Sequence, residues 1–245
     1  MRHAFLFLGL VLAIPGALAY LVRPDLRATL RFAALLSLPF ALTEPLFYPE
    51  YWRPAFLFDL ADHIGFGIED VLFVVALAAV AVASYPVVAR ATPTPIPELS
   101  RRSTIVLGRA LVPGAVAALA TGVLVMAGTP AIHAALIAMV AAGASVWLAR
   151  PDLIVPSIGG ALITTAVYQS ACLILAAVDP HVFHSVWRTR ELSAVFVLGV
   201  PLEELLYGAA SGLAASAIVP FARGERWARV APASGTQRAA HAGSR

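Results

Sequence analysis

Long apolar stretches separated by short polar segments dominate the pattern of hydrophobic and polar positions along this chain of 245 residues. A helix that crosses a membrane needs about 20 predominantly apolar residues. Seven stretches meet that requirement, at roughly 3–22, 28–47, 62–88, 105–127, 130–149, 155–178 and 192–221. The pattern therefore predicts an all-α, polytopic membrane protein with seven transmembrane helices.

The composition agrees with a chain whose solvent is the lipid bilayer. Hydrophobic residues make up 60% of the sequence and charged residues only 13%, which leaves too little polar surface for a soluble domain. The net charge of +3 reflects a shortage of acids, and we predict no nucleic-acid partner. The single cysteine, Cys172, excludes an internal disulfide and a cysteine-based metal cluster.

The arginines predict the orientation. With the N-terminus outside, 13 of the 17 arginines fall in cytoplasmic segments, and only Arg2, Arg53, Arg188 and Arg190 fall outside. Cytoplasmic segments carry an excess of basic residues. We therefore expect a multi-pass cell-membrane protein with its N-terminus outside and its C-terminus in the cytoplasm. The start also resembles a signal peptide, but an internal repeat gives this segment a counterpart, so we expect it to be retained.

Two repeated strings indicate a duplicated three-helix unit. The string Tyr20–Leu26 recurs as Trp147–Leu153, with Arg-Pro-Asp-Leu identical at a shift of 127, and Gly67–Phe73 resembles Pro201–Tyr207 at a shift of 134. The helix at 105–127 joins the units. A single linking helix leaves both units in the same orientation, which predicts two parallel repeats.

These observations divide the chain into four parts. We expect a first three-helix repeat at 1–89, a Pro-rich cytoplasmic linker with the linker helix at 90–127, and a second three-helix repeat at 128–222. The remaining segment, 223–245, is basic and predicted to be a disordered cytoplasmic tail.

Each unit carries a pair of adjacent acids inside its third predicted span, Glu69-Asp70 and Glu203-Glu204. A carboxylate at the bilayer centre costs several kcal/mol, so such residues usually face a bundle interior and mark function. Two neighbouring carboxyl groups in a low dielectric favour a proton donor beside a charged partner, which is the arrangement for general acid and base catalysis. The pairs are therefore the candidate site.

Helical spacing adds aromatic residues to both pairs. Phe73 follows Glu69 by one turn, and Tyr207 follows Glu203 by one turn. The face of an aromatic ring attracts a cation. Small residues follow Glu204 at the same spacing, so we expect Glu203 to face a cavity and Glu204 to pack against a neighbouring helix.

A competing interpretation is that the acids only join helices, through residues of the preceding span: Thr164, Thr165, Tyr168 and Gln169. Glu44, near the outer end of the second span, has no acidic counterpart in the second unit, and functional and interfacial interpretations both stay open. Four nearby aromatic residues are typical of an interfacial belt: Tyr48, Tyr51, Trp52 and Trp187. No His-x-x-x-His or Glu-x-x-His spacing occurs within a span, so no metal site is predicted.

The string Pro201–Tyr207 resembles the Pro-x-Glu-Glu signature of the heterodimeric and fused-type lycopene cyclases, a family of integral membrane proteins with a carotenoid cyclase domain. The resemblance implies closure of the acyclic ψ-ends of lycopene or a related carotenoid by proton-initiated carbocation cyclisation. Such an intramolecular lyase, an isomerase, performs no net redox chemistry and needs no cofactor. It implies catalytic roles for Glu203, Glu204, Glu69 and Asp70. Substrate-binding or cation-stabilising roles are expected for Tyr207, Phe73, Glu44 and Pro201.

The sequence also departs from the signature. Gly67 stands where the signature has proline and Asp70 replaces its second glutamate, so the first unit is either degenerate or adapted to another end group. The expected partners are an acyclic carotenoid, the lipid bilayer, and either a second copy of the chain or other enzymes of carotenoid synthesis. A carotenoid hydratase and a non-catalytic carotenoid- or lipid-binding subunit stay as alternatives. A glutamate-type intramembrane protease is disfavoured because Gly208 occupies the arginine position of its motif.

Overall fold

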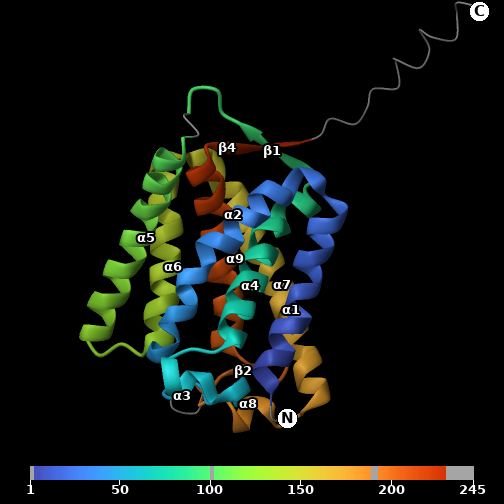
Figure 1. The fold of residues 1–245 in the computed structure, drawn as a ribbon, viewed down its shortest axis with the longest axis vertical. Helices are drawn as coiled ribbons and strands as arrows, with labels where there is room; N and C mark the ends of the chain where they lie inside the picture. The colour runs from blue at the N-terminus through green and yellow to red at the C-terminus, as the bar shows by residue number, and fades with distance from the viewer. Residues whose placement is uncertain (1–2, 100–101, 189–192, 230–245) are drawn as a thin grey trace, which may run out of the picture.

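The computed structural model describes residues 3–99, 102–188 and 193–229. Within those residues, seven helical segments are long and apolar enough to cross a membrane (Figure 1), which confirms the prediction of a polytopic helical membrane protein. The segments are α1 (Ala4–Val22), Pro24–Leu46, α4 (Ile68–Val88), α5 (Ser103–Met126), α6 (Ala131–Ala149), Pro151–Val178 and α9 (Leu202–Arg223).

Two of these segments are composite. The sixth is a short 3-10 turn, η4 (Pro151–Leu153), followed by the continuous helix α7 (Ile154–Val178). The second consists of η1 (Pro24–Leu26), α2 (Arg27–Ser37) and η2 (Leu38–Leu46). Prolines lack the backbone N–H that an α-helix needs, and η2 contains two of them. This run of nine residues in 3-10 conformation is unusually long and carries Glu44.

Helices α4, α7 and α9 pack against one another in the interior of the bundle. Helix α1 covers α4 and α7, and α6 covers α9. Helix α5 lies at the edge of the bundle, against α6 and α9 (Figure 1). The largest buried hydrophobic cluster joins residues of α1, α4 and α7 to the loops before α4 and α9.

The third and seventh spans begin later than the sequence predicts. Before α4 the chain forms η3 (Leu57–Asp59) and α3 (Leu60–Ile64). Before α9 it forms α8 (Val182–Ser185) and a hairpin of β2 (Phe196–Val197) and β3 (Val200–Pro201).

Both acidic pairs therefore lie in the first turn of a helix and not in the middle of a span. The residue before each helix explains the difference. Gly67 is extended, with φ −112° and ψ 174°, and Pro201 has ψ 141°, so neither continues a helix backwards. The N-terminal turn suits carboxylates, because its free N–H groups and the helix dipole favour negative charge.

Helices α4 and α9 are each followed by a short strand, and the two strands pair with each other. Strand β1 (Ala91–Pro95) runs antiparallel to β4 (Glu225–Arg229), with Pro93 opposite Trp227 at the centre. Disorder was expected from residue 223 onward, but Glu225–Arg229 is ordered here because β1 supplies its hydrogen-bonding partner. Residues 230–245 of that predicted tail lie outside the described part of the chain.

The repeated Arg-Pro-Asp strings make the same contacts in both halves. Arg23 forms two hydrogen bonds to Asp25, of 2.9 and 2.6 Å, and Arg150 forms two to Asp152, of 2.7 and 2.6 Å. Each arginine also donates to the carbonyl oxygen of the first residue of a strand, of β1 for Arg23 and of β4 for Arg150. The two turns thus anchor the two strands in the same way.

The opposite end of the bundle shows a second reciprocal contact. An antiparallel bridge joins Trp52 to Trp187. Next to it, the backbone N–H of Arg53 donates to the carbonyl oxygen of Val186, and that of Arg188 donates to the carbonyl oxygen of Tyr51. Both hydrogen bonds are 2.8 Å long. The loop before α4 and the loop before α9 are therefore bound to each other.

Candidate functional site

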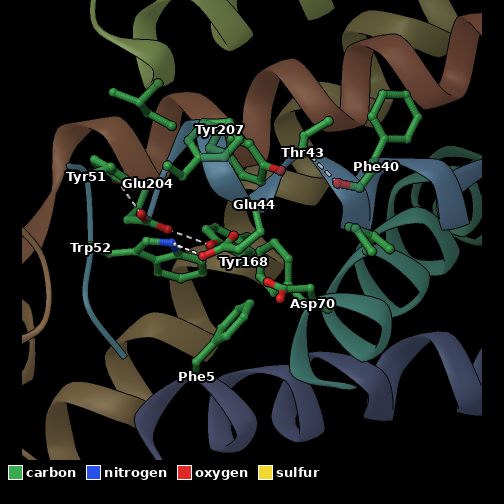
Figure 2. A pocket seen from close by; sticks show the side chains of 15 residues that line it. Phe5, Phe40, Thr43, Glu44, Tyr51, Trp52, Asp70, Tyr168, Glu204 and Tyr207 are labelled. Atoms are coloured by element: carbon green, nitrogen blue, oxygen red, sulfur yellow. Dashed lines mark hydrogen bonds between the residues drawn. The ribbon is translucent and has the colours of Figure 1, made fainter. Parts of the chain in front are cut away.

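One small cavity brings together carboxyl groups from both halves of the chain. Its volume is about 50 Å³, and Glu44, Asp70 and Glu204 line it together with an aromatic wall (Figure 2). The aromatic lining residues are Phe5, Phe40, Phe47, Tyr51, Trp52, Phe73, Tyr168 and Tyr207. The two acidic pairs thus contribute one carboxyl group each to a single site.

Three hydrogen-bond donors surround the Glu204 side chain. Oε1 accepts from the Tyr51 hydroxyl at 2.5 Å and from Trp187 Nε1 at 2.8 Å, and Oε2 accepts from the Tyr168 hydroxyl at 2.5 Å. Burial, followed by the charge of Glu204, raises the pKa of Tyr51 well above its usual value, so this hydroxyl keeps its proton. Donors on both oxygens are the surroundings that an ionised carboxylate requires.

Glu44 and Asp70 form a second group of carboxyls in the same cavity. Trp52 Nε1 donates to Glu44 Oε1 at 2.7 Å, and the backbone N–H of Gly67 donates to Asp70 Oδ2 at 2.6 Å. The carboxyl groups of Glu44 and Asp70 thus face the same small space. Two carboxyl groups close together in a buried site favour the state in which one of them carries a proton. In the described residues, no group of three His, Cys, Asp or Glu side chains is arranged to hold a metal ion.

The first acid of each pair points away from the cavity and accepts from a loop. Glu69 Oε1 accepts from the backbone N–H of Leu57 at 2.7 Å, and Glu203 Oε1 accepts from that of Ser193 at 3.1 Å. In both residues Oε2 is buried without a hydrogen-bond partner among the described residues. The expectation that Glu203 faces the cavity is therefore wrong, because Glu204 lines it instead. The expectation that Glu204 packs against a neighbouring helix is confirmed by its hydrogen bond to Tyr168 of α7. Helical spacing reveals which residues share a face but not which face the bundle covers.

The partly exposed side chain of His133 lies near the carboxyl group of Glu203. Its Nε2 is 3.7 Å from Glu203 Oε1. His133 is the third residue of α6, so it connects the start of α6 to the start of α9. Glu203 thus sits between a histidine and the loop that precedes α9.

Three aromatic rings form one side of the cavity. The ring centroids of Phe73, Tyr168 and Tyr207 lie 6.1 to 6.3 Å apart, and Phe73 stacks on Tyr207 with an interplanar angle of 24°. Phe73 and Tyr207 occupy equivalent positions of the two repeated strings. The spacing argument correctly placed these rings near acids, although the acids they accompany in the cavity are Asp70 and Glu204.

The residues that precede the acidic pairs hold them in different ways. Pro201 ends β3 and immediately precedes α9, and it does not line the cavity. Gly67 uses its N–H to hold Asp70, and a Cβ on Gly67 would lie 2.5 Å from the Phe56 ring. A proline at position 67 lacks that N–H, which explains why glycine stands there in the first unit.

Sequence reasoning missed the hydrogen-bond donors. Tyr51, Trp52 and Trp187, interpreted as interfacial aromatics, are buried and donate to Glu44 or Glu204. The available signal was Trp52-Arg53, which recurs as Trp187-Arg188 at a shift of 135, close to the shift of the acidic pairs. The alternative that an acid bonds Tyr168 does hold for Glu204, but Thr164 bonds Ser84 and Gln169 bonds Val197.

A stretch in the second half of the chain is similar to a known protein family. Residues 130–222 match the family model described as lycopene cyclase. This range begins immediately before α6 and ends within α9, so it contains Tyr168, Trp187, Glu203 and Glu204. Comparisons with curated proteins and with solved structures found no match.

Proposed function

We propose that this membrane protein closes the acyclic ψ-ends of lycopene or a related carotenoid into rings, and the premise is the match of residues 130–222 to the lycopene cyclase family model. The single observation that carries the proposal is the cavity. It combines Glu204, surrounded by donors, with the neighbouring carboxyls of Glu44 and Asp70. Proton-initiated cyclisation needs a proton donor, a proton acceptor and cation-stabilising surroundings, and this cavity offers a candidate for each.

We further propose that the site is shared between two parallel repeats. Two contacts support a two-fold relation along the bundle: the central Pro93–Trp227 pairing at one end and the Trp52–Trp187 bridge at the other. An axis through both contacts runs from one end of the bundle to the other, as parallel repeats in a membrane require. The first repeat would then contribute Asp70 to the same site as Glu204. The arginine distribution supports the N-terminus outside and the C-terminus in the cytoplasm.

The first chemical step is protonation. The proton shared by Glu44 and Asp70 moves from oxygen to a carbon of the terminal double bond, which leaves a tertiary carbocation. Trp52 and the Gly67 N–H stabilise the negative charge that develops on these carboxyls, because each donates to one of them. The rings of Phe73, Tyr168 and Tyr207 offer their faces to the cation.

Ring closure and deprotonation follow. The electrons of the neighbouring double bond form the new carbon–carbon bond, which moves the positive charge to a ring carbon. A C–H bond next to that carbon breaks, its electrons form the ring double bond, and the proton passes to Glu204. Return of this proton to the Glu44–Asp70 group within the same cavity completes the cycle, so the reaction is an isomerisation without net redox change.

Glu69 and Glu203 serve as positioning residues in this proposal. Each fixes the loop in front of its helix through a backbone N–H, and the adjacent residue of each pair then points into the cavity. Pro201 has the same kind of role because it starts α9.

The test is expression in a bacterium that accumulates lycopene, followed by separation of the pigments. The wild-type chain is expected to produce a cyclic carotenoid of unchanged mass, and Glu204→Gln and Asp70→Asn are expected to produce none while reaching the membrane at wild-type level. A product heavier by one water would identify a hydratase. Unchanged lycopene with all three folded proteins, followed by the same result in a strain that makes a longer acyclic carotenoid, would overturn the proposal.

A further inference from the structure

A large apolar groove runs along one side of the bundle and is not part of the carboxyl cavity. Its volume is about 680 Å³, within the range of small-molecule sites. Helices α2, α4, α5, α6 and α9 line it, together with η2. Small side chains predominate in the lining, among them Ala78, Ala117, Ala135 and Ala214.

The groove and the carboxyl cavity adjoin each other. Five residues line both spaces: Phe40, Thr43, Phe47, Val74 and Tyr207. The cavity alone, at about 50 Å³, has room for little more than a water molecule or two. A hydrocarbon end group placed at the carboxyls would therefore extend past these five residues, and the chain attached to it would continue into the groove.

The groove is long enough to hold an extended chain. Its lining on α5 reaches from Ala110 to Met126, which corresponds to roughly 24 Å at the rise of an α-helix. That is most of the hydrocarbon thickness of a bilayer, about 30 Å. An extended molecule lying in it would be parallel to the helices, with one end at the carboxyls.

The linker helix α5 makes the groove. On the other side of the bundle, α1 packs directly against α7 around buried residues that include Leu8, Leu12 and Leu175. In the proposed repeat, α6 is the counterpart of α1, and α2 is the counterpart of α7. Helices α6 and α2 line the groove, and α5 forms its outer wall. Only Ala110 and Pro113 of α5 are buried. This helix therefore lies at the periphery of the bundle, unlike the interior helices.

We propose that the groove holds the polyene chain of an acyclic carotenoid, and that α5 forms the wall that admits this chain from the bilayer. The inference rests on the proposed function, because the occupant is chosen by the continuity of the groove with the carboxyl site. An extended, rigid and wholly apolar chain matches the length of the groove, its small lining side chains and its apolar surface. Residues of α5 that face the groove thereby select substrates by length and width.

Three glycines of α5 provide a matched test. A Cβ placed on Gly108, Gly114 or Gly122 meets no other atom within 4 Å, so all three positions have room for a side chain. Gly114 and Gly122 line the groove, and Gly108 does not. A leucine at position 114 or 122 extends into the space assigned to the polyene, whereas a leucine at position 108 leaves that space unchanged.

The experiment expresses wild-type protein, Gly114→Leu, Gly122→Leu and the control Gly108→Leu in a lycopene-accumulating bacterium. Cyclised pigment is measured, together with the carotenoid and the phospholipid that co-purify per mole of detergent-solubilised, monodisperse protein. Gly114→Leu and Gly122→Leu are expected to lower cyclised pigment and bound carotenoid by about tenfold or more, the effect of overpacking a binding site. Gly108→Leu is expected to stay within about twofold of wild type.

The outcomes separate this inference from the proposed function. Equal cyclisation and equal bound carotenoid in all four proteins would overturn the groove assignment while leaving cyclisation intact. Loss of co-purified phospholipid in the two groove variants, with normal cyclisation, would identify an acyl chain as the occupant and also overturn it. Carotenoid bound by wild type and Gly108→Leu but not by the groove variants, without any cyclised product, would support the groove and refute the cyclase.

Discussion

The hydroxyl of Tyr51 donates a hydrogen bond of 2.5 Å to Oε1 of Glu204, although 153 positions separate the two residues in the sequence. Tyr51 belongs to the loop before α4, and Glu204 lies in the first turn of α9. The acid of the second half is thus held by a residue of the first half. This contact makes the carboxyl site depend on both halves at once.

Removal of the Tyr51 hydroxyl is expected to impair cyclisation. Tyr51→Phe keeps the ring but leaves Glu204 with two of its three donors, and a buried hydrogen bond to a charged group contributes about 1.5–3 kcal/mol. We expect product formation to fall roughly tenfold to a hundredfold. The measurement is cyclic carotenoid formed per unit of membrane protein.

The matched control is Tyr48→Phe. Tyr48 lies in the same loop, but its hydroxyl donates to the exposed residue Asp62 and it does not line the cavity. Product formation is expected to stay within about twofold of wild type. Equal losses for Tyr48→Phe and Tyr51→Phe would mean that the loop, and not the hydrogen bond to Glu204, matters.

The two acids of the second pair are expected to differ. Glu204 lines the cavity, whereas Glu203 holds Ser193 through an oxygen that an amide side chain also offers. Glu204→Gln should abolish product, and Glu203→Gln should retain most of it. The comparison uses initial rates in membranes that contain equal amounts of each protein. Complete loss in Glu203→Gln, with Glu204→Gln active, would reverse the assignment.

Much of the fold follows from the sequence because hydrophobic length and repeat spacing are local signals. All seven spans and both acidic pairs were located in this way. The starts of α4 and α9 were not, because the apolar stretches continue through loops that fold back into the protein near Phe56 and Phe196. The direction of Glu203 was also missed, since it depends on which helices cover α9, and composition carries no such information.

The role of Glu44 shows the same limit. Its residue type and its place between Thr43 and Pro45 left functional and interfacial interpretations open. Only the 3-10 conformation of η2 brings its carboxyl to Asp70 and Trp52. A carboxyl from the second span and one from the third meet there because the chain between Pro39 and Pro45 departs from an α-helix.

Replacement of Glu44 is expected to remove the proton donor without unfolding the site. Glu44→Gln retains an oxygen for the Trp52 N–H and an amide group for Asp70, but it lacks an acidic proton. We expect loss of cyclisation of at least about a hundredfold, as for removal of a general acid. Carotenoid should still co-purify with the variant, and a variant that cyclises normally would exclude Glu44 from the proton transfer.

The last prediction concerns Gly67, where the family signature has proline. Gly67→Pro brings the first unit closer to the signature, yet it removes the N–H that binds Asp70 and directs ring atoms toward Phe56. Gly67→Ala keeps the N–H but places a Cβ 2.5 Å from the Phe56 ring and 2.7 Å from Glu69 Oε2. Both variants are expected to lower thermal stability in detergent, with a cost of about 1–3 kcal/mol from overpacking.

Gly108→Ala, which adds a Cβ in open space, is the control and should melt at the same temperature as the wild type. If Gly67→Ala retains activity while Gly67→Pro loses it, the hydrogen bond to Asp70 and not the steric fit is what the glycine preserves. If both variants are as active and as stable as wild type, Asp70 does not depend on this N–H, and its position in the cavity must be maintained by Glu44 alone.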